Sequence, residues 1–315
     1  MEKNEISIVI PVYNSSQNLE NLVNEIYNIF KNNFKSYELI LVDDKSLDNS
    51  WEIIKNLCKK YKFIKGVELR KNVGQHNAIL AGLKFSTGKF IITMDDDGQN
   101  SPKNIMDLYK EISKGHDICY ANYLIKKHNF FRKAGSNLNN IFVTFLFKKP
   151  LDLYLTSFRI FTNQIKDELV KNKSSSIYLD GLLISITSNI SKIYVDHQER
   201  QYGKSNYTFR KLLNLWIQMA TGFSVAPLRL ASILGLFFSL IGFLMSFWLV
   251  FIRVPTSEVP MGWTSLIVVT LFLGGIQLVA LGAIGEYLGR TFLSVNNYPQ
   301  YSINSVLNNN DDTKE

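Results

Sequence analysis

Three consecutive carboxylates, Asp95, Asp96 and Asp97, follow directly after the apolar residues 91–94. Adjacent charges of the same sign repel one another, so a fold at neutral pH needs something near them that offsets the repulsion. A divalent cation such as Mg²⁺ or Mn²⁺ prefers oxygen ligands of this kind. The other interpretation is a solvated acidic turn after a strand, and the triplet alone does not decide between the two.

Polar or aromatic residues also follow two other apolar runs: Tyr13 comes after the run at 6–11, and Asp43 and Asp44 come after the run at 37–42. Such runs are typical of buried strands, and apolar residues at helical spacing separate them. We expect strands at residues 6–11, 37–42, 64–69, 89–94, 117–121 and 190–195, and helices at about 18–31, 48–61, 74–85 and 102–113. This alternation indicates an α/β fold with a mainly parallel sheet and helices on both faces. Ligands of such sheets bind at the carboxyl ends of the strands.

The composition narrows the class of partner. The chain has 315 residues, enough for one large or two modest domains, and 35 Lys and Arg against 27 Asp and Glu give a net charge of +8. An excess of this size suits nucleic acid, an anionic membrane surface or a phosphorylated substrate. No long basic run or zinc-finger spacing favours nucleic acid, so we expect none as a partner. We expect Cys58 and Cys119 to be buried thiols in a reducing compartment.

Two long uncharged runs near the C-terminus, residues 230–252 and 264–285, are each long enough to cross a membrane. An amphipathic stretch at 206–221 precedes them and resembles an interfacial helix. Lysine and arginine flank the pair of runs, whereas the connection at 253–263 carries one arginine, so we expect both termini in the cytoplasm. The expected domains are a catalytic domain at 1–205 without a signal peptide, juxtamembrane helices at 206–229, two spans within 230–290 and a tail at 291–315 that is disordered from Asn304.

Several motifs together resemble a known family. They are Pro11-Val12-Tyr13-Asn14, Val42-Asp43-Asp44-Lys45-Ser46, Asn72-Val73-Gly74-Gln75-His76-Asn77-Ala78-Ile79, the Asp triplet with Gln99-Asn100-Ser101-Pro102, Arg200-Gln201-Tyr202-Gly203-Lys204-Ser205-Asn206-Tyr207, Gly262-Trp263-Thr264-Ser265 and Gly285-Glu286-Tyr287-Leu288-Gly289-Arg290. The chain is similar to the family 2 inverting glycosyltransferases of the GT-A (Rossmann-like) fold. Within them it resembles the polyprenyl-phosphate enzymes, which include dolichyl-phosphate mannose synthase, and most closely the undecaprenyl-phosphate aminoarabinose transferase type.

The resemblance implies a role for each group of residues. It places a Mg²⁺ or Mn²⁺ ion on Asp95, Asp97 and Gln99, and a nucleotide on Pro11, Tyr13, Asp43, Asp44, Asn72, Gly74, Asp95 and Asp96. It implies catalytic roles for Asp95, Asp97 and Arg200, and an acceptor-phosphate site formed by Arg132, Ser157, Arg159, Lys204 and Ser205.

Alternatives remain for several of these residues. Asp43 and Asp44 also suit a helix cap, Asp96 a solvent-facing position, residues 200–205 an anchor to anionic lipid, and Arg132 and Arg159 surface cations. His76 is interpreted as structural.

The function expected from the resemblance is the inverting transfer of one sugar from a nucleotide-sugar, expected to be a UDP-sugar, to undecaprenyl phosphate at a bacterial inner membrane. The resemblance also implies a homo-oligomer, specifically a tetramer. A processive polysaccharide synthase is one alternative, but its expected Gln-x-x-Arg-Trp motif is missing from the sequence. A non-enzymatic membrane scaffold with a decayed transferase domain is the other. The identity of the sugar does not follow from the sequence, because hydroxyl recognition depends on the shape of the pocket.

Overall fold

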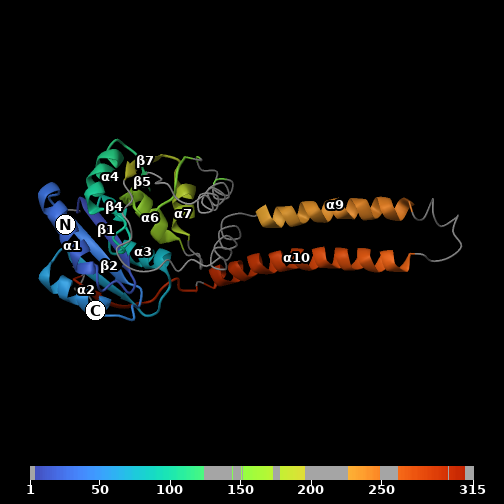
Figure 1. The fold of residues 1–315 in the computed structure, drawn as a ribbon, viewed down its shortest axis with the longest axis horizontal. Helices are drawn as coiled ribbons and strands as arrows, with labels where there is room; N and C mark the ends of the chain where they lie inside the picture. Colours follow the sequence, from blue (N-terminus) through green and yellow to red (C-terminus); the bar gives the residue numbers. More distant parts are fainter. Residues whose placement is uncertain are drawn as a thin grey trace. The chain divides into compact units, whose positions relative to one another are not determined.

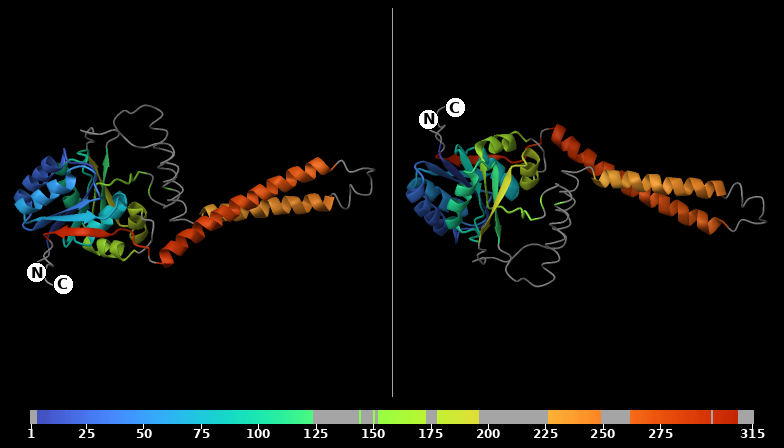
Figure 2. Two further views of the ribbon diagram at one scale, coloured as in Figure 1. Left: turned by 90° about the horizontal axis from the view of Figure 1, so that it is seen from below. Right: turned by 90° about the horizontal axis from the view of Figure 1, so that it is seen from above.

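The computed structural model describes residues 4–123, 144, 150, 152–172, 178–195, 226–248, 262–296 and 298–308. The chain divides into two compact units, one formed by Met1–Asn206 with Pro299–Glu315 and the other by Tyr207–Tyr298. The first unit is an α/β domain, and the second contains two long helices (Figures 1 and 2).

One eight-stranded sheet organises the described part of the α/β domain, in the order β7-β5-β6-β4-β1-β2-β3-β8. Its strands are β1 (Ile6–Val12), β2 (Tyr37–Asp43), β3 (Ile64–Leu69), β4 (Phe90–Thr93), β5 (Ile118–Tyr123), β6 (Arg159–Thr162), β7 (Ile190–Val195) and β8 (Ile303–Leu307). The central pairs β1–β2, β1–β4 and β2–β3 are parallel, as is β5–β7, whereas β6 and β8 pair antiparallel to their neighbours. The predicted mainly parallel sheet is therefore confirmed.

Helices cover both faces of the sheet because alternate residues of each buried strand point to opposite faces. Ile8 and Ile10 of β1 belong to one core with helices α1 (Leu19–Asn33), α2 (Ser50–Lys60) and α4 (Ile105–Ile112). Val9 of β1 belongs to the other core, with helices α3 (Gln75–Leu83), α6 (Asn163–Lys171) and α7 (Leu179–Ile186). A short 3₁₀ helix, η1 (Pro102–Asn104), leads into α4.

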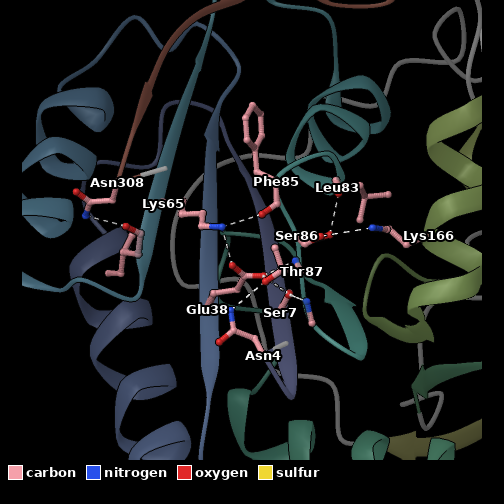
Figure 3. A network of polar contacts seen from close by, with 12 residues as sticks. Asn4, Ser7, Glu38, Lys65, Leu83, Phe85, Ser86, Thr87, Lys166 and Asn308 are labelled. Carbon is pink, nitrogen blue, oxygen red and sulfur yellow. Dashed lines mark hydrogen bonds and ion pairs between the residues drawn. The ribbon is translucent and has the colours of Figure 1, made fainter. Parts of the chain in front are cut away.

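A buried ion pair joins the early parts of β2 and β3. Lys65 Nζ lies 2.8 Å from a Glu38 carboxylate oxygen, and both side chains are less than a tenth exposed. Figure 3 shows Ser7 and Thr87 converging on the same carboxylate, which accepts a hydrogen bond from the Thr87 hydroxyl at 2.9 Å. One oxygen of the carboxylate thus accepts hydrogen bonds and the other pairs with Lys65, so the buried charge is balanced.

The chain beyond the second unit returns to the sheet as β8, so the prediction of disorder from Asn304 is wrong for residues 304–307. β8 pairs antiparallel with β3. The Asn304 amide donates to Glu68 at 2.6 Å, and the Asn308 amide donates to the Ile64 carbonyl at 3.0 Å. These contacts order a segment whose polar composition suggested a free tail.

The second unit contains α9 (Ala226–Trp248) and α10 (Trp263–Val295), which lie side by side (Figures 1 and 2). Within the described residues, one helical segment, Leu273–Val295, has the length and composition to cross a membrane. Two spans therefore stay a prediction. The amphipathic stretch at 206–221 lies outside the described residues.

Candidate active site

The structure brings four strand ends of the sheet together through hydrogen bonds between their loops. β1 leads to Tyr13, β2 to Asp44, and β4 to the Asp triplet, while the loop after β3 leads to Gly74 at the start of α3. Parallel strands present their carboxyl ends at the same edge of a sheet, which explains why residues so far apart in sequence meet.

Asp44 ties the end of β2 to the loop that precedes α3. It is 3% exposed, and its two carboxylate oxygens accept the backbone N–H groups of Val73 at 2.8 Å and Gly74 at 2.9 Å. Gly74 has φ +85°, a conformation that glycine adopts most readily. Burial raises the pKa of Asp44, although these two hydrogen bonds oppose the rise. Asp44 thus fixes the shape of the predicted nucleotide loop.

Asp43 is also buried and accepts the backbone N–H of Ser46 at 3.3 Å. Burial raises its pKa, against the hydrogen bonds from Ser46. Helix α2 has Asn49 as its N-cap residue, so neither Asp43 nor Asp44 caps that helix. The helix-cap alternative for the pair is wrong in respect of α2.

Asp96 does not point freely to solvent, so that alternative is wrong. One of its oxygens accepts the backbone N–H of Tyr13 at 3.2 Å and the hydroxyl of Ser15. Burial raises the pKa of Asp96 to about 6, with a further contribution from the charge of Asp97 and opposition from Ser15. Asp96 therefore connects the acidic turn to the loop after β1, where Tyr13 is half-exposed.

Asp95 is held from two other directions. Its oxygens accept the Gln75 side-chain amide and, at 2.5 Å, the Ser157 hydroxyl. Burial, together with the charges of Asp97 and Asp96, raises the pKa of Asp95 to about 6. The protein thus supplies neutral donors to Asp95 and leaves the repulsion within the triplet incompletely offset.

Asp97 accepts the backbone N–H of Gln99 at 3.1 Å, which closes a tight turn around Gly98 at φ +75°. In the described part of the chain, no group of three or more His, Cys, Asp or Glu side chains is arranged to hold a metal ion. Mg²⁺ is commonly held by one or two carboxylates and by phosphate oxygens of the substrate. The carboxylate oxygens of Asp95 and Asp97 are donors of the kind that such an ion prefers.

Arg159 is not a surface cation, so that alternative is wrong for this residue. It is 1% exposed at the start of β6 and forms an ion pair with Asp180 of α7. Burial by itself lowers the pKa of Arg159, but Asp180 and Tyr120 raise it above its usual value. Its charge is therefore already balanced by Asp180, and a direct contact with the acceptor phosphate stays a prediction.

The remaining predicted residues fall into two groups. Pro11 is buried within β1, paired in register with Val42, and Asn72 is exposed in the loop before α3. Arg132, Arg200, Lys204 and Ser205 lie outside the described residues.

Sequence reasoning missed the roles of Gln75, Ser15 and Asp180. Gln75 follows Gly74 at a helix start, and this position is a signal that it faces the site. A single aspartate such as Asp180 in the first turn of a helix is an ordinary feature, and it gave no such signal.

Comparisons with known proteins agree with this geometry. The sequence profile described as "Glycosyl transferase family 2" matches residues 7–171. The chain is 33% identical over 310 residues to the undecaprenyl-phosphate 4-deoxy-4-formamido-L-arabinose transferase of Proteus mirabilis, covering 96% of this chain and 94% of that protein. The enzyme of the same name from Photorhabdus laumondii is 33% identical, with 97% and 95% covered.

Among solved structures, a mycobacterial protein matches with a TM-score of 0.52 at 16% identity, covering 69% of this chain and 73% of that one. A similarity at this identity concerns the fold alone. The sequence relationships go further, because they extend over nearly the whole chain. The chain is a glycosyltransferase and belongs to glycosyl transferase family 2.

Proposed function

We propose that the protein transfers a single sugar from a UDP-sugar to undecaprenyl phosphate at the cytoplasmic face of a bacterial inner membrane. The observation that carries this proposal is the 33% identity, over 96% of the chain, to a transferase named for undecaprenyl phosphate. The lipid-linked sugar made in this way would serve as a donor for glycan modification in the cell envelope.

The donor nucleotide lies along the loops after β1, β2 and β3 in this proposal. Tyr13 offers a half-exposed aromatic ring for the base. Asp44 and Gly74 hold the loop shape against which the ribose binds. Asp96, bonded to the loop of Tyr13, keeps this nucleotide side in register with the acidic turn.

Asp95 and Asp97, with Gln99 beside them, would hold Mg²⁺ or Mn²⁺ between the turn and the diphosphate. When bound, the cation offsets the negative charge that develops on the departing diphosphate. Ser157 and Gln75 orient the Asp95 carboxylate for this purpose.

The acceptor phosphate is ionised at neutral pH, so attack on the sugar requires little help from a general base. Positioning and charge stabilisation then carry most of the catalysis, and in-line attack inverts the anomeric carbon. Ser157 adjoins Asp95 and is therefore well placed to contact the acceptor phosphate. The phosphate sites in this proposal are completed by Arg132, Arg200, Lys204 and Ser205. We also propose that the enzyme is a homo-oligomer.

Helices α9 and α10 anchor the enzyme where its lipid acceptor resides. Both helices expose leucine, isoleucine and phenylalanine side chains, such as Leu236 and Leu278, which suit the hydrocarbon core of a membrane. We propose that both helices cross the membrane.

The test of the proposed function is a transfer assay with full-length protein in detergent. Nucleotide-sugars are screened against undecaprenyl phosphate with MnCl₂ or MgCl₂, and product masses are measured. We expect one nucleotide-sugar to give lipid with a single sugar added. A polymeric product, or no transfer from any donor, contradicts the proposal.

Asp97 provides a sharper test of the metal assignment. We expect Asp97→Ala to lower turnover at least about 100-fold, because the cation that would offset the transition-state charge loses a ligand. The melting temperature of this variant should stay close to that of the parent. The matched control is Asp107→Ala, which removes an exposed carboxylate of α4. Full activity of Asp97→Ala contradicts the metal assignment.

A further inference from the structure

A chain of contacts connects Asp95 to the start of α7. The first step is the pair of bonds to Asp95 itself: Gln75 is the first residue of α3, and Ser157 lies two residues before Arg159, the first residue of β6. Each carboxylate oxygen keeps a lone pair for another ligand. These two donors therefore set the direction of Asp95 without occupying it fully.

Arg159 connects the Ser157 segment to α7. Its guanidinium forms the ion pair with Asp180 and also donates to the Thr156 carbonyl at 3.4 Å. The Tyr120 hydroxyl donates to the same Asp180 oxygen at 3.2 Å. Asp180 thus fixes the arginine, and the arginine fixes the backbone that carries Ser157.

The start of α7 also contacts the other side of Asp95, through α3. The rings of Tyr178 and His76 lie 5.4 Å apart, nearly perpendicular to each other. His76 follows Gln75 in the first turn of α3. The contacts therefore close into a ring that runs from Asp95 through Ser157, Arg159, Asp180, Tyr178, His76 and Gln75 back to Asp95.

The simplest explanation for Asp180 is that it contributes only to the stability of the fold. A buried ion pair is a poor device for stability, because apolar side chains of similar volume often serve as well. The chain contains a matched pair for comparison, Glu38 with Lys65, which is equally buried. Glu38 lies five residues before Asp43, so it is about 17 Å from that strand end at the rise of a strand.

We infer that Asp180 is a positioning residue: through Arg159 and Ser157 it holds the Asp95 carboxylate in the direction that binds a metal–diphosphate group. The inference rests on the proposed function in taking the acidic turn as the metal–diphosphate site. In this inference Asp180 contacts neither substrate nor metal and acts through Arg159, its ion-pair partner. Its effect should therefore be seen in metal affinity before it is seen in any chemical step.

The experiment measures Mn²⁺ binding by full-length protein in the presence of UDP, from the loss of the free Mn²⁺ signal in electron paramagnetic resonance. For Asp180→Asn we expect the dissociation constant for Mn²⁺ to rise roughly 10-fold or more, as for other groups that orient a metal ligand. Asp180→Glu should recover part of the loss. The control, Glu38→Gln, should lower the melting temperature without changing Mn²⁺ affinity.

A second variant guards against misfolding. The double variant Arg159→Met with Asp180→Leu replaces the ion pair by apolar side chains, and we expect it to fold and to bind Mn²⁺ as weakly as Asp180→Asn. The inference is overturned if Asp180→Asn and the double variant both bind Mn²⁺ with the affinity of the parent. So does a fall in kcat of Asp180→Asn at parental Mn²⁺ affinity, which is the result expected of a catalytic base.

The proposed function fails by a different result. Failure of the parent protein to transfer sugar to undecaprenyl phosphate, with Mn²⁺ and UDP bound normally, contradicts the proposed acceptor and leaves the role of Asp180 supported. If the parent binds no Mn²⁺ in the presence of UDP, the positioning role is overturned together with the metal site.

Discussion

The carboxylate of Asp44 forms hydrogen bonds with the backbone of the protein itself. Both oxygens accept amide hydrogens, from Val73 and Gly74, and the group is almost fully buried. A carboxylate that accepts two backbone amides fixes a loop more firmly than a neutral side chain, since hydrogen bonds to charged groups are the stronger kind. Under the proposed function, the nucleotide would bind to a loop that already has its final shape.

We expect Asp44→Asn to weaken UDP binding about tenfold. The variant replaces one acceptor oxygen by an amide group that opposes a backbone N–H. A hydrogen bond to a charged group contributes about 1.5–3 kcal/mol, and about 1.4 kcal/mol corresponds to tenfold in affinity. Calorimetric titration of UDP with Mn²⁺ measures the change. Asp167→Asn, which alters a half-exposed carboxylate of α6, is the control and should bind as the parent does. An unchanged affinity for Asp44→Asn shows that the loop keeps its shape without the charge.

Individual site residues were predictable to the extent that they stand at strand ends. Asp44 and the Asp triplet follow apolar runs directly, so the sequence predicted their edge of the sheet. The partners of these carboxylates were not predictable. Ser157 is 62 residues from Asp95 in the sequence. Asp180 belongs to α7 and its partner Arg159 to β6, and helix α6 separates the two in the sequence. Such contacts depend on the packing of the chain, and no local pattern encodes them.

At the scale of elements, the Glu38–Lys65 pair joins β2 to β3 inside the sheet. Burial by itself raises the pKa of Glu38, but hydrogen bonds from Lys65, Ser7 and Thr87 outweigh it and hold the pKa below its usual value. A carboxylate with a depressed pKa stabilises the fold above its unfolded pKa, about 4.3, and this contribution is lost as the pH falls through the folded value.

We expect Glu38→Gln to lower the stability of the full-length protein by about 3–5 kcal/mol at pH 7, because Lys65 is left buried without its partner. The difference from the parent should shrink as the pH falls through the lowered pKa of Glu38, where the parent's carboxylate also becomes neutral. Melting temperatures in detergent across pH 3–8 measure both effects. Glu52→Gln, from an exposed pair with Lys55, should change little at any pH. A difference that grows toward acid contradicts the assigned direction of the pKa.

The elements from β1 to β5 agree closely with the predictions, because long apolar runs and helical spacing are local signals. β3 and β7 begin and end at the predicted residues. β6, α6 and α7 were missed. β6 has four residues and begins with Arg159, whose charge suggested the surface. β8 was missed because it is a short strand of five residues that contains the polar pair Asn304-Ser305, and because its partner, β3, is more than 230 residues away.

At the scale of the whole molecule, the pairing of β8 with β3 limits the membrane topology. The helical unit, Tyr207–Tyr298, is inserted between two parts of one domain. A single crossing would put β8 and β3 on opposite sides of the membrane, which their hydrogen-bonded pairing excludes. If the insertion crosses the membrane as proposed, it therefore crosses an even number of times. The proposed two crossings, by α9 and α10, meet this condition, and the helix lengths of 23 and 33 residues each exceed the roughly 20 that a span requires.

This topology predicts which sites a membrane-impermeant maleimide reaches in intact bacterial cells. We expect Ser257→Cys, in the predicted external connection outside the described residues, to be labelled without lysis. Lys110→Cys on α4 and Ser302→Cys just before β8 should be labelled only after the membrane is opened. The native thiols should contribute little background, because burial raises the pKa of Cys58 to about 12 and that of Cys119 to about 11.

The comparison between Lys110→Cys and Ser302→Cys is the decisive part of this experiment. Both positions belong to the α/β domain, on either side of the inserted helices. If they respond alike and Ser257→Cys responds differently, the chain crosses the membrane twice. If Ser302→Cys is labelled in intact cells while Lys110→Cys is protected, the chain crosses an odd number of times and β8 does not pair with β3 in the membrane-bound protein. Protection of all three until lysis indicates that the helices lie on the membrane without crossing it.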